Sequence, residues 1–349
     1  MTPASSERPA FPWAWATALL IAAIAVLCVP VLRAHSATPA LVPSAAILAI
    51  LGGVFARNLP GFPVAARRGS KQIIRFVIPA AIVLLGAGLD LTQLADPRLG
   101  VGGLLTTLAC MLVALLASFG AARLLGLNGR TAGLLAAGTA VCGSSAILAV
   151  APVLEAEDDE LVVALGTVNL MGLCAMLAVP ALAAAFDLHD EAAGVFAGTS
   201  VHAVPQAVAA GAAVSDTAAG FATLFKMVRV AMLAPLVLAF GAVIAWRKPN
   251  TTGPARTRRI GAIVPWFVWG FLALAALRSF GVLDAALGET SLGDGLQSAG
   301  KLLLTYAMVA IGLEIDLRSL LGVGFRGLLA GVIAGTILLA FSLFLATLL

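Results

Sequence analysis

Charge is what this sequence has least of. Only 11% of its 349 residues are Asp, Glu, Lys or Arg, whereas 61% are hydrophobic and the mean hydropathy is +1.06. A soluble domain carries about 25% charged residues, so this composition excludes one, and no nucleic-acid partner is expected. The apolar runs last about 20 residues, enough for a helix to cross a bilayer, and the short alternating segments of an outer-membrane barrel are missing. We predict an all-α polytopic membrane protein that forms a single integral membrane domain over residues 1–349.

Motifs of enzymes and metal sites are also missing. The four cysteines form no CxxC pair and have no metal-ligand spacing, so we expect thiols buried in the membrane and no bound metal or cofactor. No P-loop, dinucleotide fingerprint, GxSxG or HExxH motif occurs. A membrane-embedded enzyme or sensor would need a catalytic pair or a soluble output domain, and neither is visible. The sequence therefore predicts that the protein is not an enzyme.

What the chain does have is a series of about eleven apolar segments. They are predicted at about 13–32, 40–59, 73–94, 101–125, 131–153, 161–186, 192–213, 219–246, 260–280, 297–317 and 324–347. Lys and Arg gather in the even-numbered loops, which places those loops in the cytoplasm. We expect an inner (plasma) membrane protein with its N-terminus in the cytoplasm and its C-terminus outside. The sixth loop, with Asp187, Asp190 and Glu191, is the one that does not fit.

One stretch of sequence occurs twice. Residues 75–94 and 301–320 each open on a basic residue and end in Gly-x-x-[Leu/Ile]-Asp-Leu-x-x-Leu, with Gly86 and Gly312 in register. The two copies lie seven segments apart, an odd number, so their elements at about 73–125 and 299–347 are predicted to be inverted repeats. Such repeats place a substrate site near the middle of the membrane. Where the symmetry partner of segment 131–153 lies stays open, and so does a chance similarity between two Leu- and Gly-rich helices.

Segment 131–153 is predicted to be a broken helix. Its run Gly-Thr-x-x-Cys-Gly-Ser-Ser is a poor helix former, because Gly costs about 1 kcal/mol against Ala and Ser competes for backbone hydrogen bonds. A helix that restarts there would offer an anion its N-terminal N–H groups. The alternative is a small-residue face for close helix packing. The candidate substrate-binding residues of this segment are Thr139, Cys142, Gly143, Ser144 and Ser145.

Segment 192–213 carries the second candidate break. His202, Pro205 and Gln206 interrupt an otherwise apolar helix, and a membrane His usually faces the bundle interior or a water-filled cavity. Its near-neutral pKa suits a proton relay, although a simple hydrogen bond to a backbone carbonyl would also explain it. Whether the helix is broken here stays open. The candidate binding residues are Thr199, Ser200, His202 and Gln206.

Two cations and one amide complete the candidate site. Lys226 and Arg229 are spaced i, i+3 and share one helix face, which suits an anion, whereas snorkelling to the interface is the alternative for both. Asn169 lies in the middle of segment 161–186, where a buried amide needs partners. We expect Asn169 and His202 to support coupling, and Lys226 and Arg229 to bind substrate.

Several of these motifs together resemble the YeiH family, described as sulfate exporters. The matching stretches are Gly138–Val153, Ser200–Gly211, Lys226–Pro235 and Ala310–Leu317, and the resemblance covers nearly the whole chain from about residue 40. The family is similar to the cation/proton antiporter and bile-acid symporter superfamily. The resemblance therefore implies an antiporter-like fold with a panel domain, a core domain with crossed broken helices at about 131–153 and 192–213, and an elevator mechanism. By the same analogy a homodimer is expected.

One departure from that superfamily favours an anion. Cation antiporters place a carboxylate in the helix after the first broken helix, whereas this chain offers Asn169 there. We expect a secondary active transporter of a small anion, such as sulfate, sulfite, or an organic sulfonate or carboxylate, coupled to H⁺ or Na⁺ in the lipid bilayer. A cation/proton antiporter and an anion channel are the alternatives.

Overall fold

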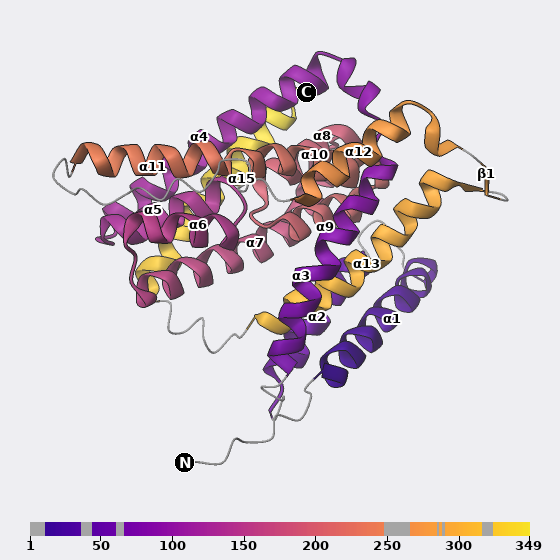
Figure 1. The fold of residues 1–349 in the computed structure, drawn as a ribbon, viewed down its shortest axis with the longest axis horizontal. Coiled ribbons are helices and arrows are strands. Elements are labelled where there is room, and N and C mark those ends of the chain that lie inside the picture. Colours follow the sequence, from indigo (N-terminus) through magenta and orange to yellow (C-terminus); the bar gives the residue numbers. More distant parts are fainter. Residues whose placement is uncertain are drawn as a thin grey trace.

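The computed structural model describes residues 11–35, 44–60, 66–247, 266–284, 286–287, 290–315 and 324–349. Within these ranges the chain is almost entirely helical (Figure 1). The α-helices are α1 (Phe11–His35), α2 (Ala45–Asn58), α3 (Ala66–Leu85), α4 (Gly103–Leu124), α5 (Gly129–Ala140), α6 (Ser144–Leu154), α7 (Asp158–Ala185), α8 (Asp190–Ser200), α9 (Val204–Val214), α10 (Asp216–Ala231), α11 (Leu233–Arg247), α12 (Trp266–Ser279), α13 (Leu292–Glu314) and α15 (Phe325–Ala346).

Short elements join some of these helices. Between α3 and α4 lie two 3-10 turns, η2 (Gly86–Gly88) and η3 (Leu91–Ala95), and one π-helical turn, η4 (Arg98–Gly102). After α12 come the 3-10 turn η6 (Val282–Asp284) and the antiparallel pair β1 (Ala286–Leu287) and β2 (Thr290–Ser291). In this stretch Asp90 accepts a hydrogen bond from the backbone N–H of Thr92, which lowers the pKa of the Asp90 carboxyl.

The described residues contain six apolar stretches long enough to cross a bilayer, judged by length and composition. They are Gly69–Gly88, Arg98–Leu124, Asp158–Ala185, Asp216–Ile244, Leu292–Glu314 and Phe325–Ala346. Every apolar segment expected from the sequence contains a helix or a pair of helices. The structure therefore supports a multi-pass, all-α membrane protein.

The helices pack into two groups. In the first, α13 lies against α2 and α3, and α1 and α12 complete the group. The contacts are close: a Cβ added at Gly312 would lie 2.2 Å from the Ile50 carbonyl oxygen, and one added at Gly86 would lie 2.3 Å from that of Phe271. Both glycines of the duplicated stretch therefore stand where two backbones meet. The second copy is described only to Ile315, so its Asp316 lies outside the described residues.

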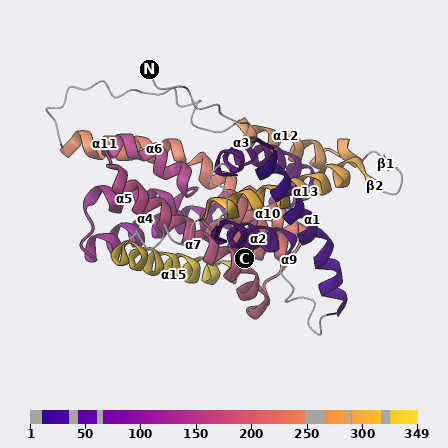
Figure 2. The same cartoon turned by 90° about the horizontal axis from the view of Figure 1, so that it is seen from below.

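The second group contains α4 to α10 with α15, in which α15 packs along α4, α7 and α8. In Figures 1 and 2 α1 and α13 lie towards the right, whereas α5, α6 and α7 lie towards the left. The two groups meet mainly where α9 touches α2 and α13, and where α10 touches η2. An ion pair of 2.6 Å from Lys301 Nζ on α13 to Asp216 Oδ2 on α10 also joins them.

Helices α5 and α6 form an antiparallel hairpin, called here the first hairpin (Gly129–Leu154). The end of α6 lies beside the start of α5, because a Cβ added at Gly133 would be 2.9 Å from Leu154 Cδ1. Arg130 NH1 also donates to the Glu155 carbonyl oxygen at 2.9 Å. At 12 and 11 residues, each arm is about 17 Å long, half the thickness of a bilayer core.

Helices α8 and α9 form the second hairpin (Asp190–Val214). Its arms also lie side by side, since a Cβ added at Gly194 or at Gly211 would in both cases lie 2.7 Å from the Ala218 carbonyl oxygen of α10. Near the open end of this hairpin Ala193 and Val214 pack against Ala218 in one small apolar cluster. The second hairpin therefore wraps the first turns of α10.

These hairpins confirm one expectation and correct another. Both segments are broken, at residues 141–143 and 201–203. However, neither is a crossed helix that continues to the far side, because Gly133 lies beside Leu154 and Gly194 lies near Gly211. The crossed arrangement implied by the antiporter resemblance is therefore wrong for this chain. The number of segments that cross the membrane stays a prediction, with six candidates by length and composition among the described residues.

Candidate functional site

The tips of the two hairpins meet. A Cβ added at Gly143 would lie 3.8 Å from the His202 carbonyl oxygen and 3.9 Å from Ala203 Cα, in ordinary van der Waals contact. It would also lie 3.7 Å from Val168 Cγ1 on α7. Two breaks that are about 60 residues apart in the sequence thus form one place in the fold, against the middle of α7.

The first tip depends on one glycine. Gly143 has φ +71° and ψ −128°, a backbone conformation that side chains other than hydrogen rarely allow. Its carbonyl oxygen then accepts the first intrahelical hydrogen bonds of α6, from the N–H groups of Ala146 and Ile147. The amides of Ser144 and Ser145 precede these donors, so they point out of the N-terminal end of α6.

The second tip reverses without a glycine. Val201 and Ala203 have extended backbones, and α9 starts with Val204 and Pro205. Proline suits the first turn of a helix because its nitrogen has no hydrogen to leave unpaired. The first intrahelical donor of α9 is the N–H of Ala207, which bonds to the Ala203 carbonyl oxygen. The amide of Gln206 is therefore left at the N-terminal end of α9.

Arg229 of α10 forms hydrogen bonds to both hairpins, close to their tips. This side chain of α10 is completely buried, and all of its hydrogen bonds in the described residues go to backbone carbonyls. Its Nε donates to Ala140 at 2.9 Å and its NH2 donates to Thr139, both at the end of α5. Its NH1 donates to Thr199 at 2.7 Å, and to Gly198 and Val201 at 3.3 Å each, at the end of α8.

Lys226 lies one turn before Arg229 and supports the second tip. Its Nζ donates to the Val201 carbonyl oxygen at 2.6 Å, and the side chain is completely buried. Arg229 reaches the first tip as well, through the carbonyls of Ala140 and Thr139. The pair expected from the i, i+3 spacing therefore does share one face of α10. That face points at the hairpin tips and not at the membrane interface, so the snorkelling alternative is wrong.

The tips form a region of positive potential. Each helix C-terminus carries roughly −0.5 charge and each N-terminus roughly +0.5. The guanidinium of Arg229 therefore offsets the C-termini of α5 and α8, and Lys226 Nζ donates to Val201 at the end of α8, which leaves the N-termini of α6 and α9 without a compensating side chain. Among the described residues no carboxylate pairs with either cation. The arrangement can hold an anion.

Two buried polar atoms at this place have no hydrogen-bond partner in the part of the chain that the structure describes. They are Nδ1 of His202 and Oε1 of Gln206, and each side chain is only 2% exposed. Both residues pack on Gly172 of α7, where an added Cβ would lie 2.2 Å from Gln206 Oε1 and 3.2 Å from His202 Cβ. A buried group without a partner costs about 1–3 kcal/mol, so unmet polar atoms here point to a ligand that completes them.

The remaining candidate residues divide into two sets. Ser144 and Ser145 lie at the start of α6, where Ser144 is half-buried and Ser145 is exposed. By contrast, the Thr199 hydroxyl donates to the Val195 carbonyl at 2.7 Å and contacts Ser342 of α15 at 2.6 Å, and the Ser200 hydroxyl donates to Phe196 at 2.6 Å. These two hydroxyls tie α8 internally and do not reach the tips.

Thr139 and Asn169 stand at the edge of the site. Thr139 is buried and contributes its carbonyl oxygen to Arg229. Asn169 is partly exposed and follows Val168, the residue of α7 that touches the first tip. Gly172, on which the two unpartnered side chains rest, was missed by sequence reasoning. No signal marks it, since a lone glycine in an apolar helix is common.

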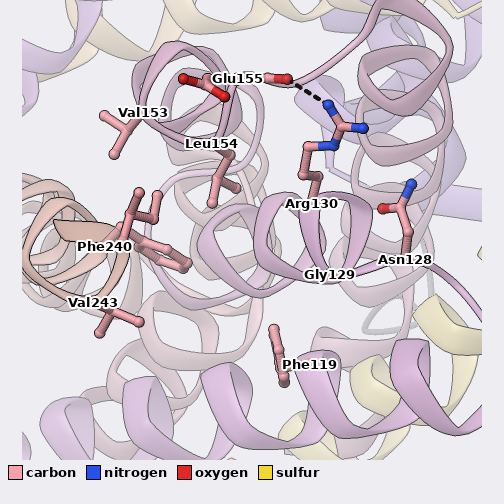
Figure 3. Close-up of a pocket in the computed structure, with 10 residues that line it drawn as sticks. Phe119, Asn128, Gly129, Arg130, Val153, Leu154, Glu155, Phe240 and Val243 are labelled. Atoms are coloured by element: carbon pink, nitrogen blue, oxygen red, sulfur yellow. Dashed lines mark hydrogen bonds between the residues drawn. The ribbon is translucent and has the colours of Figure 1, made fainter. Parts of the chain in front are cut away.

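A cavity lies away from the tips. It measures about 480 Å³ and is found at the open end of the first hairpin, between α4, α5, α6 and α11. Figure 3 shows Phe119 and Phe240 on its apolar side and Arg130 bonded to the Glu155 backbone on its polar side. Arg130 also pairs with Glu157 at 2.9 Å and with Glu160 at 3.3 Å. This guanidinium is already neutralised, so the cavity is a poorer anion site than the tips.

Comparison with known proteins assigns the family. The family model described as "Conserved hypothetical protein 698" matches residues 17–331. This chain belongs to that family. The curated relatives carry the family name UPF0324, and the predicted resemblance to the YeiH-like proteins is confirmed.

Two relatives show how far the similarity extends. The UPF0324 membrane protein Atu0671 of Agrobacterium fabrum is 34% identical over 305 residues, which cover 86% of this chain and 84% of the relative. The UPF0324 membrane protein TauZ of Paracoccus denitrificans is 34% identical over 334 residues, which cover 95% of this chain and 93% of the relative. No solved structure matches the chain. The UPF0324 similarity thus spans both hairpins and both groups of helices.

Proposed function

We propose that this UPF0324 protein is a secondary active transporter of a small anion, such as sulfate, sulfite, or an organic sulfonate or carboxylate. One observation carries the proposal: two helix N-termini and two unpartnered buried side chains, His202 and Gln206, converge where the hairpin tips meet. N–H groups at helix N-termini bind oxyanions well. The His202 imidazole can donate or accept a hydrogen bond, so it suits both protonated and deprotonated oxyanions.

The hairpins also support a membrane topology with nine crossing segments. If neither hairpin crosses, the first opens to the cytoplasm and the second opens to the outside. The basic loops then keep their cytoplasmic side, so the N-terminus still lies in the cytoplasm and the C-terminus outside an inner membrane. The acidic loop of Asp187, Asp190 and Glu191 now falls outside, which removes the one misfit. The acidic residues after α6 fall inside, next to Arg130.

The same topology provides an inverted partner for the first hairpin. The helices of the second hairpin begin 61 and 60 residues after those of the first. The Gly-Thr pair at 138–139 recurs at 198–199. If the two hairpins enter the membrane from opposite sides, they are related by inversion. They would then belong to the same inverted repeat as the elements 73–125 and 299–347. The elements of the two repeats would then follow in different orders along the chain: the first hairpin comes after 73–125, whereas the second comes before 299–347.

An elevator motion fits the division into two groups of helices. The hairpin group, which would be the core domain, touches the α2–α3–α13 group, which would be the panel, mainly through α9 and α10. A small contact area of this kind lets one group slide past the other and carry the anion across. His202, at the tips, is the proposed proton-coupling residue, with Asn169 in support, and sodium is the alternative coupling ion.

The rival functions differ in what they require of the tips. A cation/proton antiporter needs a carboxylate at the site, and no Asp or Glu among the described residues pairs with Lys226 or Arg229. An anion channel needs only the positive potential. Saturable countertransport in proteoliposomes separates a carrier from a channel, because a channel conducts without exchanging one bound anion for another.

Thermal stabilisation of the purified protein tests the proposal. A ligand that binds only the folded state stabilises it by about 2.7 kcal/mol at 100 times its Kd. We expect sulfate, sulfite or an organic sulfonate to raise the unfolding temperature, and Gln206→Leu and Ser145→Ala to weaken that rise. Ser118→Ala is the matched control, because Ser118 is buried in α4 outside the two tips. Stabilisation by Na⁺ or Li⁺ alone would overturn the proposal in favour of a cation antiporter.

A further inference from the structure

The Arg229 contacts have a consequence for how the protein moves. The five carbonyl oxygens that it binds belong to two hairpins, two on α5 and three on α8 or just after it. A single planar guanidinium with a fixed fork of donors can satisfy both ends only while the two tips keep one relative position. Lys226 holds the second tip from the same helix, through Val201.

We propose that Arg229 is a positioning residue that fastens the two hairpin tips together, so that neither hairpin opens by itself as a gate. The hairpins and α10 then move as one body, because the bonds from Arg229 and Lys226 of α10 reach the ends of both hairpins.

The charge of Arg229 supports this role over direct binding of the anion. Its nitrogen atoms already donate to carbonyls, and separating the tips would leave those carbonyls and the buried guanidinium without partners. A buried charge that loses its hydrogen-bond partners is strongly destabilised. An independent opening of either hairpin is opposed by that cost, whereas sliding of the whole body against α2 and α13 leaves these bonds intact. The inference depends on the proposed function at one point only, where it interprets this sliding as transport of the anion.

The native thiol of Cys142 reports on the contact between the tips. It lies in the first tip and is 6% exposed in the closed arrangement. We would measure its rate of modification by N-ethylmaleimide in the full-length protein, with and without sulfate, and identify the modified residue by peptide mass. In the natural sequence we expect slow modification under both conditions. In Arg229→Lys, which keeps the charge but loses the fork, we expect a rate roughly tenfold higher or more.

The control variant is Arg278→Lys, because Arg278 pairs with Asp284 and Asp294 far from the tips. It should leave the Cys142 rate unchanged. Protection of Cys142 in Arg229→Lys, together with loss of stabilisation by sulfate, would overturn the inference and make Arg229 a ligand of the anion. Fast modification of Cys142 in the natural sequence when sulfate is withdrawn would also overturn it.

If Arg229→Lys does not fold, hydrogen exchange in the natural sequence decides the matter. Peptides that cover residues 139–146 and 198–206 should exchange at one common rate, because fastened tips open together. Clearly different rates for the two tips would contradict the inference. Should no anion stabilise the protein while Cys142 behaves as expected, the fastening of the tips stands and the proposed function fails.

Discussion

The two hairpins have the same outline but are held in different ways. Each breaks after a helix of 11 or 12 residues and presents the N-terminus of a second helix at the tips. The first reverses at Gly143 with a positive φ, and its open end is tied by ion pairs from Arg130. The second reverses at residues without positive φ, and its arms are packed against the backbone of α10. Similar geometry is thus reached by ionic contacts in one hairpin and by close packing in the other.

The difference suggests a division of labour. The second hairpin is buried along nearly its whole length and carries the unpartnered side chains of His202 and Gln206. The first keeps one face of α6 open at Ser145 and Leu148. We infer that the second hairpin supplies the fixed polar groups of the site, whereas α6 of the first hairpin is less enclosed. Substitutions at equivalent positions of the two hairpins should therefore have unequal effects.

The largest effect is expected at the glycine shared by both hairpins. A Cβ at Gly198 would lie 2.7 Å from the Ala222 carbonyl oxygen, whereas one at Gly138 would meet only side-chain atoms of Ile147 at 2.8 Å and of Val168 at 3.0 Å. Backbone cannot yield as a side chain can, so Gly198→Ala should lower the free energy of unfolding by about 3 kcal/mol. For Gly138→Ala the change should stay within about 1 kcal/mol, because the helix gains propensity. Thermal unfolding in detergent measures both, and equal losses would contradict the comparison.

The turn residues should show the next largest difference. Gly143→Ala places a side chain at φ +71° and should cost about 1–3 kcal/mol, although an added Cβ would meet its neighbours only at van der Waals distance. Ala203 has φ −93° and ψ 148°, which any residue adopts, so Ala203→Gly should cost less than about 1 kcal/mol. The loss in Gly143→Ala should come with weaker stabilisation by sulfate, because the amides of α6 are displaced. An unstrained Gly143→Ala would refute the role given to this glycine.

The open ends of the hairpins should respond differently to salt. Arg130 is 42% exposed at the side chain and its partner Glu157 is 69% exposed, so Arg130→Gln should lower stability by about 1 kcal/mol or less. Raising the ionic strength should speed hydrogen exchange at the open end of the first hairpin. The open end of the second, held by Ala193, Val214 and Ala218, should change little. Equal responses at both ends would remove this distinction.

The smallest effect is expected for the ion pair between the two groups of helices. Lys301 and Asp216 join α13 to the start of α10, which the second hairpin wraps. Asp216→Asn should change the rate of anion exchange in proteoliposomes by less than about fivefold, since Asp216 is 67% exposed. Asp190→Asn, in the exposed first turn of α8, is a matched control expected to leave the rate unchanged. A complete loss of transport would mean that the ion pair has a role in the transport cycle beyond holding α13 against α10.

Much of the candidate site could be predicted from residue types. The break at Gly143 with Ser144 and Ser145 was predicted, because their backbone preferences oppose a continuous helix, and it is found. The sequence left open a break at His202 and Pro205, and the structure shows one. The i, i+3 pair of Lys226 and Arg229 shares a face as the helical period requires. The partners of the Thr199 and Ser200 hydroxyl groups could not be predicted from the sequence. Thr199 and Ser200 turn back to their own helix, because a carbonyl one turn earlier is always within reach.

The sequence by itself determined that the chain lies in a membrane, where its helices are, that one of them breaks at Gly143 and which family it resembles. These are local properties: apolar length, helical period and the conformations that Gly and Pro allow. Only the tertiary structure decided that each broken segment folds back. The direction in which a chain leaves a break depends on what packs beside it, namely Leu154 beside Gly133 and α10 within the second hairpin. The same holds for Arg229, whose partners on α5 lie 89 and 90 residues away and come within reach only when the tips meet.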